Sequence, residues 1–305
     1  MRVAFIGLGT MGSRMVANLQ EHGHDVTVTD VRREAAGPAI EQGGTWADSP
    51  REAARDAELV LSSLPGPREV EAVVLGDDGV IHGAAPDAIY ADLSTSSVSL
   101  ARRIYAECKA QGISALDAPV SGGPKGAQDG SLIIMVGGDE PAFERALPTF
   151  KAIGGNIQYV GEAGCGAIAK LCHNMIGLAS AHILAEGFTL AVKAGLKPET
   201  FLEVLLGGAY GRQMGLRNSI PEVVFTGDFD TPRFALGLAR KDIGLATELG
   251  REMNVPMAMA NVAEQTMIEA MNRGWAGKDS SASFMLQEER AGVEVRAPKE
   301  KERDA

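Results

Sequence analysis

The sequence predicts an α/β fold, with a doubly wound parallel sheet followed by a long connecting helix and an all-α C-terminal domain. Three observations lead to this prediction. Short apolar runs alternate with helical patterns through the first half of the chain, as a sheet covered by helices on both faces requires. No strand pattern follows residue 161. The length of 305 residues is above the usual size of one domain and suggests two.

The predicted strands are short apolar runs, and several of them are apolar on both faces. They are Val3–Ile6, Val26–Thr29, Leu59–Leu64, Ile89–Leu93, Ser114–Asp117, Leu132–Val136 and Ile157–Val160. Amphipathic patterns such as Met11–His22 and Val98–Gln111 lie between them. This alternation predicts that residues 1–161 form the doubly wound sheet.

The second half of the chain has helical patterns only. One long run of Ala, Leu, Ile and Met extends from Glu162 to Ala194 and is closed by Gly195. The further patterns are Glu199–Leu206, Arg240–Met253, Pro256–Arg273 and Ser280–Arg290. We therefore expect residues 162–295 to form the all-α domain and the mostly polar residues 296–305 to form a frayed tail.

Composition excludes several classes of function. Lysine and arginine total 29 and aspartate and glutamate total 40, so the net charge of −11 argues against a nucleic-acid partner. The three cysteines form no C-x-x-C pair, which argues against a disulfide scaffold or a thiolate metal site and fits a reducing cytoplasm. We expect no membrane partner, since no apolar run approaches the length of a span and no signal-peptide layout opens the chain.

The segment Gly7-Leu8-Gly9-Thr10-Met11-Gly12 lies between the first strand and a helix. In this G-x-G-x-x-G context, Gly7 allows a tight turn, Gly9 lets the backbone approach a pyrophosphate, and Gly12 lets the helix pack on the strand. Asp30 closes the second strand, 18 positions after Gly12, where an acid binds the ribose hydroxyls. The motif predicts a Rossmann-type domain that binds NAD, because the 2′-phosphate of NADP would meet a like charge.

NADP stays possible at this site. Arg32 and Arg33 follow Asp30 and could hold a phosphate if the carboxylate turned away, although a solvated turn is their ordinary role. Two further loops, Leu64-Pro65 and Ser94-Thr95, follow strands at the carboxyl edge of the sheet, where ligands of open α/β sheets bind. The hydroxyls of the second loop could reach the nicotinamide end of the cofactor or cap the next helix.

Two features point to chemistry beyond the cofactor. Ser121-Gly122-Gly123 follows the fifth strand and offers a hydroxyl and unhindered N–H groups, which suit a carboxylate but also occur in flexible loops. Gly166, Lys170 and Asn174 are spaced four apart and share one helix face. Lysine is almost never buried without a partner, so Lys170 is either functional or reaches solvent at the helix end, and Asn174 alone would be an interior polar group.

Together these motifs resemble the β-hydroxyacid dehydrogenases, the group of 3-hydroxyisobutyrate dehydrogenase and tartronate semialdehyde reductase. The resemblance covers nearly the whole chain. It rests on Phe5–Gly12, Asp92–Thr95, Asp117–Gly123, the Gly166–Lys170–Asn174 face and Lys241–Ala246. It implies an NAD-dependent oxidoreductase that interconverts a small anionic 3-hydroxy acid and its 3-oxo acid or semialdehyde. It also implies a homodimer or homotetramer formed through the all-α domain.

The resemblance implies a role for each matching residue. Lys170 corresponds to the catalytic lysine, which would take the hydroxyl proton in oxidation and return it in reduction. The residues implied to bind substrate are Ser121, Gly122, Gly123 and Asn174. Lys241 corresponds to a lysine that reaches the cleft near substrate and nicotinamide, although by itself it would be a solvated residue opening a helix. His173 stands where many members have asparagine, and we assign it no chemistry.

Substrate choice is expected to lie in Gly207–Asn218, where Arg212 could pair with a second anionic group or be an ordinary surface residue. Phe234 is either a wall of the pocket or core. Two rival functions stay open. One is an NADPH-preferring reductase of glyoxylate or succinic semialdehyde. The other is a catalytically silent dinucleotide-binding module, against which the Lys170 and Asn174 face weighs.

Overall fold

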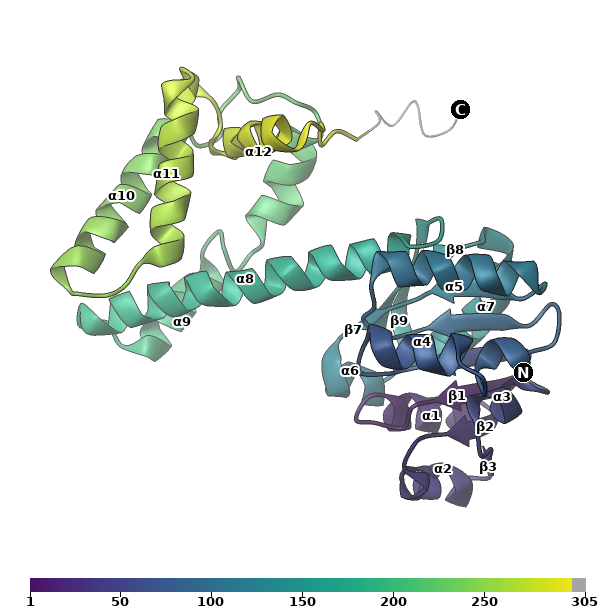
Figure 1. Cartoon of the computed structure of the whole chain (residues 1–305). Helices are drawn as coiled ribbons and strands as arrows, with labels where there is room; N and C mark the ends of the chain where they lie inside the picture. Colours follow the sequence, from purple (N-terminus) through teal and green to yellow (C-terminus); the bar gives the residue numbers. More distant parts are fainter. Residues whose placement is uncertain (298–305) are drawn as a thin grey trace. The chain divides into compact units, whose positions relative to one another are not determined.

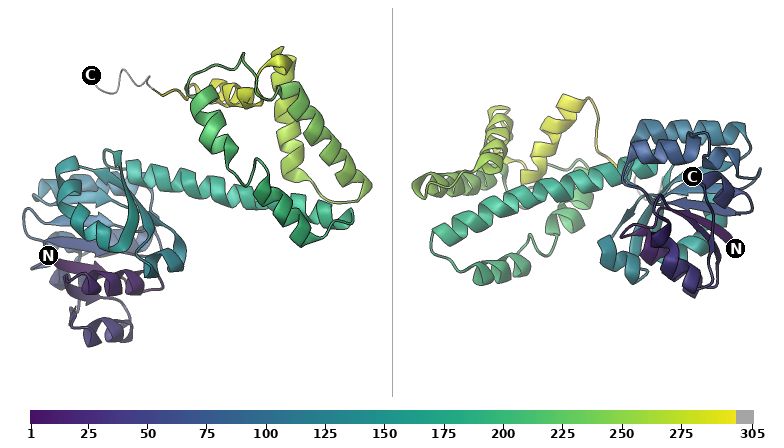
Figure 2. Two further views of the ribbon diagram at one scale, coloured as in Figure 1. Left: turned by 180° about the vertical axis from the view of Figure 1, so that it is seen from behind. Right: turned by 60° about the horizontal axis from the view of Figure 1, so that its bottom comes forward.

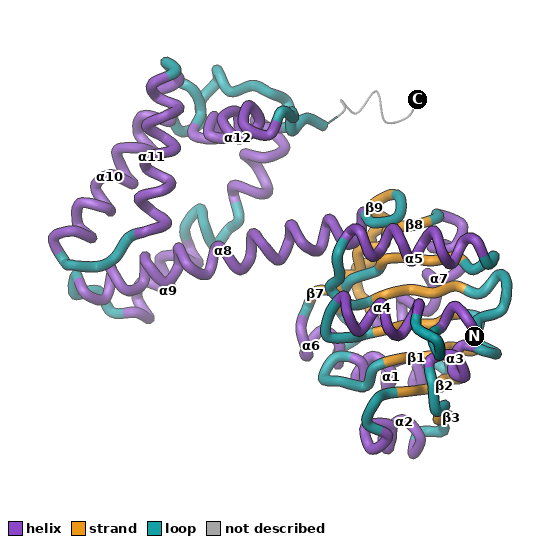
Figure 3. Tube along the Cα trace, in the orientation of Figure 1, coloured by secondary structure: helices purple, strands orange, loops and turns teal. Residues whose placement is uncertain are grey.

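The computed structural model describes residues 1–297. Contacts divide the chain into two compact units, Met1–Ile176 and Gly177–Ala305. All named strands lie in the first unit, and the second is built from helices and loops (Figure 3). The division falls inside the helix α8 (Cys165–Lys193), because its first turns pack with the sheet, whereas residue 161, the expected boundary, ends the last strand.

The first unit contains one nine-stranded sheet. Its strands are β1 (Arg2–Ile6), β2 (Asp25–Thr29), β3 (Thr45–Trp46), β4 (Leu59–Ser62), β5 (Ile89–Asp92), β6 (Ser114–Asp117), β7 (Val120–Ser121), β8 (Leu132–Gly138) and β9 (Gly154–Gly161). The order is β3-β2-β1-β4-β5-β6-β8-β7, with β9 paired to β8. β1 lies between β2 and β4, so the strand order reverses direction at β1. Cofactors bind at such a switch point in open α/β sheets.

The sheet is parallel from β3 to β6 and mixed beyond. β8 runs antiparallel to β6 and β7, which corrects the expectation of a wholly parallel sheet. A parallel return needs a crossover helix that spans the sheet. The helix between β7 and β8 is α6 (Gly123–Gln128), whose six residues are too few for that.

Helices cover both faces of the sheet (Figure 1). They are α1 (Gly12–Glu21), α2 (Gly37–Glu41), α3 (Pro50–Ala54), α4 (Pro67–Leu75), α5 (Val98–Ala110), α6 and α7 (Glu140–Ile153). Alternate strand residues enter different cores, since successive side chains point to opposite faces. Phe5 packs with α1 and α7, whereas Ala4 and Ile6 pack with α3, α4 and α5. The predicted doubly wound architecture is confirmed by these two cores.

The second unit is helical, as expected. After α8 it contains α9 (Pro198–Gly207), α10 (Leu236–Glu252), α11 (Ala258–Asn272) and α12 (Ser283–Ala291) around a core that includes Phe229, Leu236 and Leu286. A π-helical segment, Gly215–Val224, was not anticipated. Pro221 lies inside it and has no N–H to donate, so a regular α-helical register is interrupted there.

Two expectations need correction. Arg296, the first residue of the expected frayed tail, is held by Glu288, with 2.6 Å between guanidinium and carboxylate, while residues 298–305 lie outside the described part. The expectation that no apolar run approaches a membrane span is wrong by length and composition. Helix α8 has 29 residues, a mean hydropathy of 1.5 in its most apolar window and only 6% of that window buried. Figure 2 shows α8 as one continuous helix.

Candidate active site

The glycine-rich loop after β1 has the geometry of a dinucleotide site. Gly7 has φ +94°, and a Cβ on it would lie 2.4 Å from the carbonyl oxygen of Ser63. A Cβ on Gly12 would lie 1.9 Å from the carbonyl oxygen of Gly7, so α1 packs directly on the turn. By contrast, a Cβ on Gly9 would meet no protein atom within 4 Å. The protein's own packing therefore requires Gly7 and Gly12, while the open space at Gly9 fits an approaching pyrophosphate.

The N-terminus of α1 adds to this fit. No side chain caps the helix at Met11, and Thr10 is exposed beside it. Uncapped N–H groups in a first helical turn bind phosphate oxygens well. The residues present thus suit the pyrophosphate of NAD or NADP.

Asp30 is fixed against the glycine-rich loop. Its Oδ2 accepts a hydrogen bond from the backbone N–H of Leu8 at 2.6 Å, and its Oδ1 accepts one from the backbone N–H of Arg32 at 2.9 Å. The carboxylate is therefore not turned away, as NADP binding by the arginines would require. Arg33 is directed to Asp48 instead, with 3.6 Å between charged groups. This arrangement favours the ribose hydroxyls of NAD.

The loops after β4 and β5 are tied together by Ser94. Its hydroxyl accepts a hydrogen bond from the backbone N–H of Leu64 at 2.9 Å, and its own N–H donates to Asp92 at 3.0 Å. Ser94 is 5% exposed, so it organises the loops and is not available to a ligand. Leu64 is half-buried and Pro65 is exposed at this edge.

Thr95 does not cap α5. Its side chain is exposed, and the cap of α5 is Ser97, whose hydroxyl accepts a hydrogen bond from the N–H of Leu100 at 3.3 Å. The capping role that competed with cofactor binding thus belongs to another residue. Thr95 is free to contact a ligand.

The Ser121–Gly123 loop opens toward solvent. Ser121 ends the two-residue strand β7, and Gly122 and Gly123 have φ of +136° and +64°, which L side chains rarely adopt. Gly122 is the N-cap of α6, with no capping side chain. Both glycines are exposed, so their N–H groups can face an anion.

Lys170 lies on α8 and is 7% exposed. Burial lowers the pKa of its ammonium group. The ion pairs within residues 1–176 join arginines to acids, and none of them includes Lys170. Asn174, one turn further along, is half-buried. A lysine without an acidic partner and with a lowered pKa can exchange a proton with a substrate.

The other candidates belong to the second unit and are exposed. Lys241 pairs with its neighbour Asp242, with 2.9 Å between ammonium and carboxylate. Arg212 forms none of the unit's ion pairs among the described residues. Phe234 is 44% exposed and so is not core. Arg212 and Lys241 are accessible cations.

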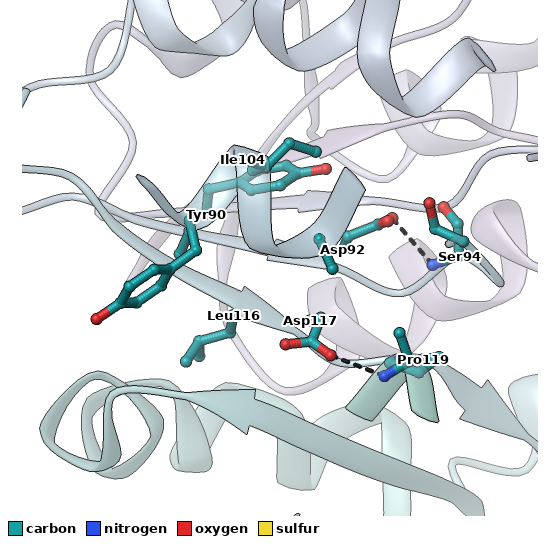
Figure 4. A pocket seen from close by; sticks show the side chains of 12 residues that line it. Tyr90, Asp92, Ser94, Ile104, Leu116, Asp117 and Pro119 are labelled. Atoms are coloured by element: carbon teal, nitrogen blue, oxygen red, sulfur yellow. Dashed lines mark hydrogen bonds between the residues drawn. The ribbon is translucent and has the colours of Figure 1, made fainter. Parts of the chain in front are cut away.

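Sequence reasoning gave no role to two buried acids, Asp92 and Asp117, which are register partners at the ends of β5 and β6 (Figure 4). Burial raises the pKa of each carboxyl. A cavity of about 10 Å³ adjoins both, which is too small for any substrate. Each acid lies at the end of an apolar strand, and the two strands are neighbours in the sheet. This shared position was the signal in the sequence that could have pointed to the pair.

Family models of NAD-binding domains match most of the chain. Residues 2–161 match the family model described as the NAD binding domain of 6-phosphogluconate dehydrogenase. Residues 164–286 match the one described as NAD-binding of NADP-dependent 3-hydroxyisobutyrate dehydrogenase.

Among curated relatives, 2-(hydroxymethyl)glutarate dehydrogenase of Eubacterium barkeri is 35% identical over 96% of this chain and 97% of its own. The 3-hydroxyisobutyrate dehydrogenase of Pseudomonas aeruginosa is 39% identical over 80% of this chain and 83% of its own. The structure of Mycobacterium tuberculosis 3-hydroxyisobutyrate dehydrogenase with L-serine is 33% identical, with a TM-score of 0.66 over 94% of this chain and 99% of that one.

Proposed function

This chain belongs to the β-hydroxyacid dehydrogenase family of 3-hydroxyisobutyrate dehydrogenase, and we propose on that premise that Lys170 is its catalytic acid–base. The chain is an NAD(P)-dependent oxidoreductase that acts on the CH–OH group of a hydroxy acid. The single observation that carries the role of Lys170 is its burial without an acidic partner in its unit. In water, solvation favours the charged ammonium form of a lysine. Burial of Lys170 removes much of that solvation and so favours the neutral amine.

The mechanism follows from these residues. In oxidation, the neutral amine of Lys170 accepts the proton of the substrate hydroxyl, and in reduction the ammonium returns it to the carbonyl oxygen. NAD, which the Gly7–Gly12 loop and Asp30 would hold, would supply the hydride acceptor for this oxidation. The N–H groups of Gly122 and Gly123 and the hydroxyl of Ser121 hold the substrate carboxylate, and the amide of Asn174 fixes its orientation.

The substrate class follows from the chemistry shared by the relatives' ligands. 2-(Hydroxymethyl)glutarate, 3-hydroxyisobutyrate and L-serine all contain HOCH₂–CH(R)–COO⁻, a 3-hydroxypropanoate with a substituent R on carbon 2. We propose that this chain oxidises a member of this class. The carboxylate binds the Ser121 loop.

The test is a steady-state assay of NAD reduction. It compares 3-hydroxyisobutyrate, serine, glycerate, threonate, 4-hydroxybutyrate, 2-(hydroxymethyl)glutarate and hydroxy-sulfonates. Lys170→Ala should lower kcat by roughly 10²–10⁴-fold with the best substrate while NADH still binds. Lys151→Ala, which removes an exposed lysine of α7, is the matched control and should keep kcat. Near-native turnover of Lys170→Ala would refute the mechanism. If the wild type turned over none of these compounds, the alternative of a catalytically silent dinucleotide-binding module would be favoured.

We propose that the protein is a homodimer or homotetramer. Large apolar side chains are exposed along α8, including Met175 at 63%, Ile176 at 58% and Leu178 at 69%. Contiguous exposed apolar surface of this kind is typical of subunit interfaces. Light scattering in detergent-free buffer should give a multiple of the 32.0 kDa chain mass, and Leu178→Glu should reduce that mass. A monomeric wild type, or one that requires detergent, would contradict the proposal.

A cytoplasmic location is proposed on the chemistry of the cysteines. Cys108, Cys165 and Cys172 are all free thiols, which persist in a reducing compartment. Cell fractionation tests this, and recovery with secreted proteins or membranes would contradict it.

A further inference from the structure

Asp117 joins two parts of the proposed site. It is the last residue of β6, and the chain reaches Ser121 four positions later. Its carboxylate is buried, with the residue 8% exposed, and it faces the first turn of α8. Oδ1 accepts a hydrogen bond from the N–H of Gly164 at 2.8 Å, and Oδ2 accepts one from the N–H of Ala167 at 2.7 Å. The helix that carries Lys170 is thus attached to the strand that leads into the substrate loop.

The backbone around this attachment is packed as closely as glycine permits. A Cβ on Gly166 would lie 2.2 Å from the carbonyl oxygen of Asp117 and 2.5 Å from that of Met135. A Cβ on Gly137 would lie 2.7 Å from the N of Gly166 and 2.9 Å from the carbonyl oxygen of Glu162. Glycines on both sides therefore let the first turn of α8 rest directly on the ends of β6 and β8.

A charged side chain at a buried helix N-terminus loses solvation free energy. Burial raises the pKa of Asp117, which means that the ionised form loses solvation there. A neutral hydroxyl suffices elsewhere in the same unit, since Ser97 caps α5. The carboxylate supplies two charge-assisted hydrogen bonds at once and matches the positive end of the helix dipole. The attachment is therefore stronger and more directional than a helix start alone requires.

Lys170 follows Ala167 by three residues, less than one helical turn. Its ammonium therefore moves with the first turn of α8. If that turn shifts, Lys170 shifts relative to Ser121, which is tied to Asp117 through the chain. A displacement of about 1 Å between reacting groups can cost about 10²-fold in rate.

We propose that Asp117 is a positioning residue that clamps the first turn of α8 to the end of β6 and so sets Lys170 against the Ser121–Gly123 loop. The proposal rests on the proposed acid–base role of Lys170. Asp117 itself contacts backbone amides and takes no part in proton transfer.

The experiment compares Asp117→Asn, Lys170→Ala and a control, Asp139→Asn, under one assay. Asparagine keeps the shape of Asp117 but presents an NH₂ group to one of the two N–H donors, so one hydrogen bond is replaced by a repulsive contact. Asp139 also follows a strand of this sheet, but it is exposed, and the one side chain within residues 1–297 that donates to it is the hydroxyl of Tyr105. All rates are expressed as kcat per NADH-binding site, so that a loss of folded protein does not count as a loss of rate.

Asp117→Asn should lower kcat by roughly 10–100-fold, change the substrate KM by less than about 3-fold and leave the NADH dissociation constant unaltered. Asp139→Asn should keep kcat within about 2-fold. If Asp117→Asn keeps kcat while Lys170→Ala loses it, the clamp is wrong and the proposed function stands. If Lys170→Ala keeps kcat, the proposed function is wrong. A rise in KM alone would place Asp117 in substrate binding and would also overturn the clamp.

A wild-type measurement covers the case in which Asp117→Asn does not fold. Hydrogen–deuterium exchange compares peptides covering residues 162–170 and 197–205. The second peptide contains the start of α9, which no side chain caps. The first should exchange at least about tenfold more slowly, because its amide donors are bound to the Asp117 carboxylate. Equal exchange rates would overturn the proposal.

Discussion

Asp30→Ala tests the basis of NAD preference. The structure gives this carboxylate two protein partners, the N–H of Leu8 at 2.6 Å and the N–H of Arg32 at 2.9 Å. In the complex it would also accept from ribose hydroxyls. A hydrogen bond to a charged group contributes about 1.5–3 kcal/mol, and each 1.4 kcal/mol corresponds to a factor of ten in affinity. The loss of the ribose contact should therefore raise the NADH dissociation constant by roughly 10–150-fold.

NADPH binding should respond in the opposite sense. Removal of the carboxylate removes its repulsion of the 2′-phosphate and frees Arg32, whose Nε lies 3.8 Å from Asp30. The ratio of the two dissociation constants should therefore shift toward NADPH by more than about tenfold. The assay is fluorescence titration with NADH and NADPH at one ionic strength, because phosphate binding is screened by salt.

The matched control is Asp77→Ala, which removes an exposed carboxylate after α4. It should change both constants by less than about 2-fold. If Asp30→Ala binds NADH as tightly as the wild type does, the assignment of Asp30 is refuted. If it weakens NADH and NADPH equally, Asp30 acts only by shaping the loop through Leu8, and the electrostatic argument fails.

Three further predictions concern Lys170, the glycine-rich loop and α8. Burial lowers the pKa of Lys170, so kcat/KM for oxidation should rise with pH through a pKa below that of a free lysine, and kcat/KM for reduction should fall above the same pKa; a rise at the free-lysine pKa would contradict this. Gly12→Ala and Gly9→Ala should both weaken NADH binding by at least about tenfold, but only Gly12→Ala should lower the Tm, because its Cβ would lie 1.9 Å from the carbonyl oxygen of Gly7; equal Tm values would count against the packing argument. Glu186→Gln should reduce unfolding free energy in urea by about 1–2 kcal/mol, since its carboxylate accepts two N–H bonds, at 2.7 and 3.0 Å, from the first turn of α11; an unchanged midpoint would exclude a capping role.

The fold was predictable where a pattern repeats along the chain. All seven expected strands form, with ends that differ by a few residues, because apolar runs of four or more report burial directly. β3 and β7 contain two residues each and so carry no periodicity. The antiparallel direction of β8 was also missed, since a hydrophobic pattern is the same in either direction.

The site divides in the same way. The glycine-rich loop and the Lys170 face were predicted because their residues are neighbours along one segment. The role of Ser94 was not, because its hydroxyl bonds a backbone group 30 positions away. The role of Asp117 was missed for the same reason, as its carboxylate binds amides 47 and 50 positions along the chain.

The sequence by itself determined seven of the strands, the longer helices, the dinucleotide loop and the identity of the candidate base, since each depends on local spacing and residue chemistry. Tertiary structure alone decided that Asp30 is fixed against Leu8, that Ser97 and not Thr95 caps α5, and that Asp117 binds the start of α8. The physical reason is that a hydrogen bond between distant segments depends on where the strands end in space. The local sequence pattern does not specify those positions.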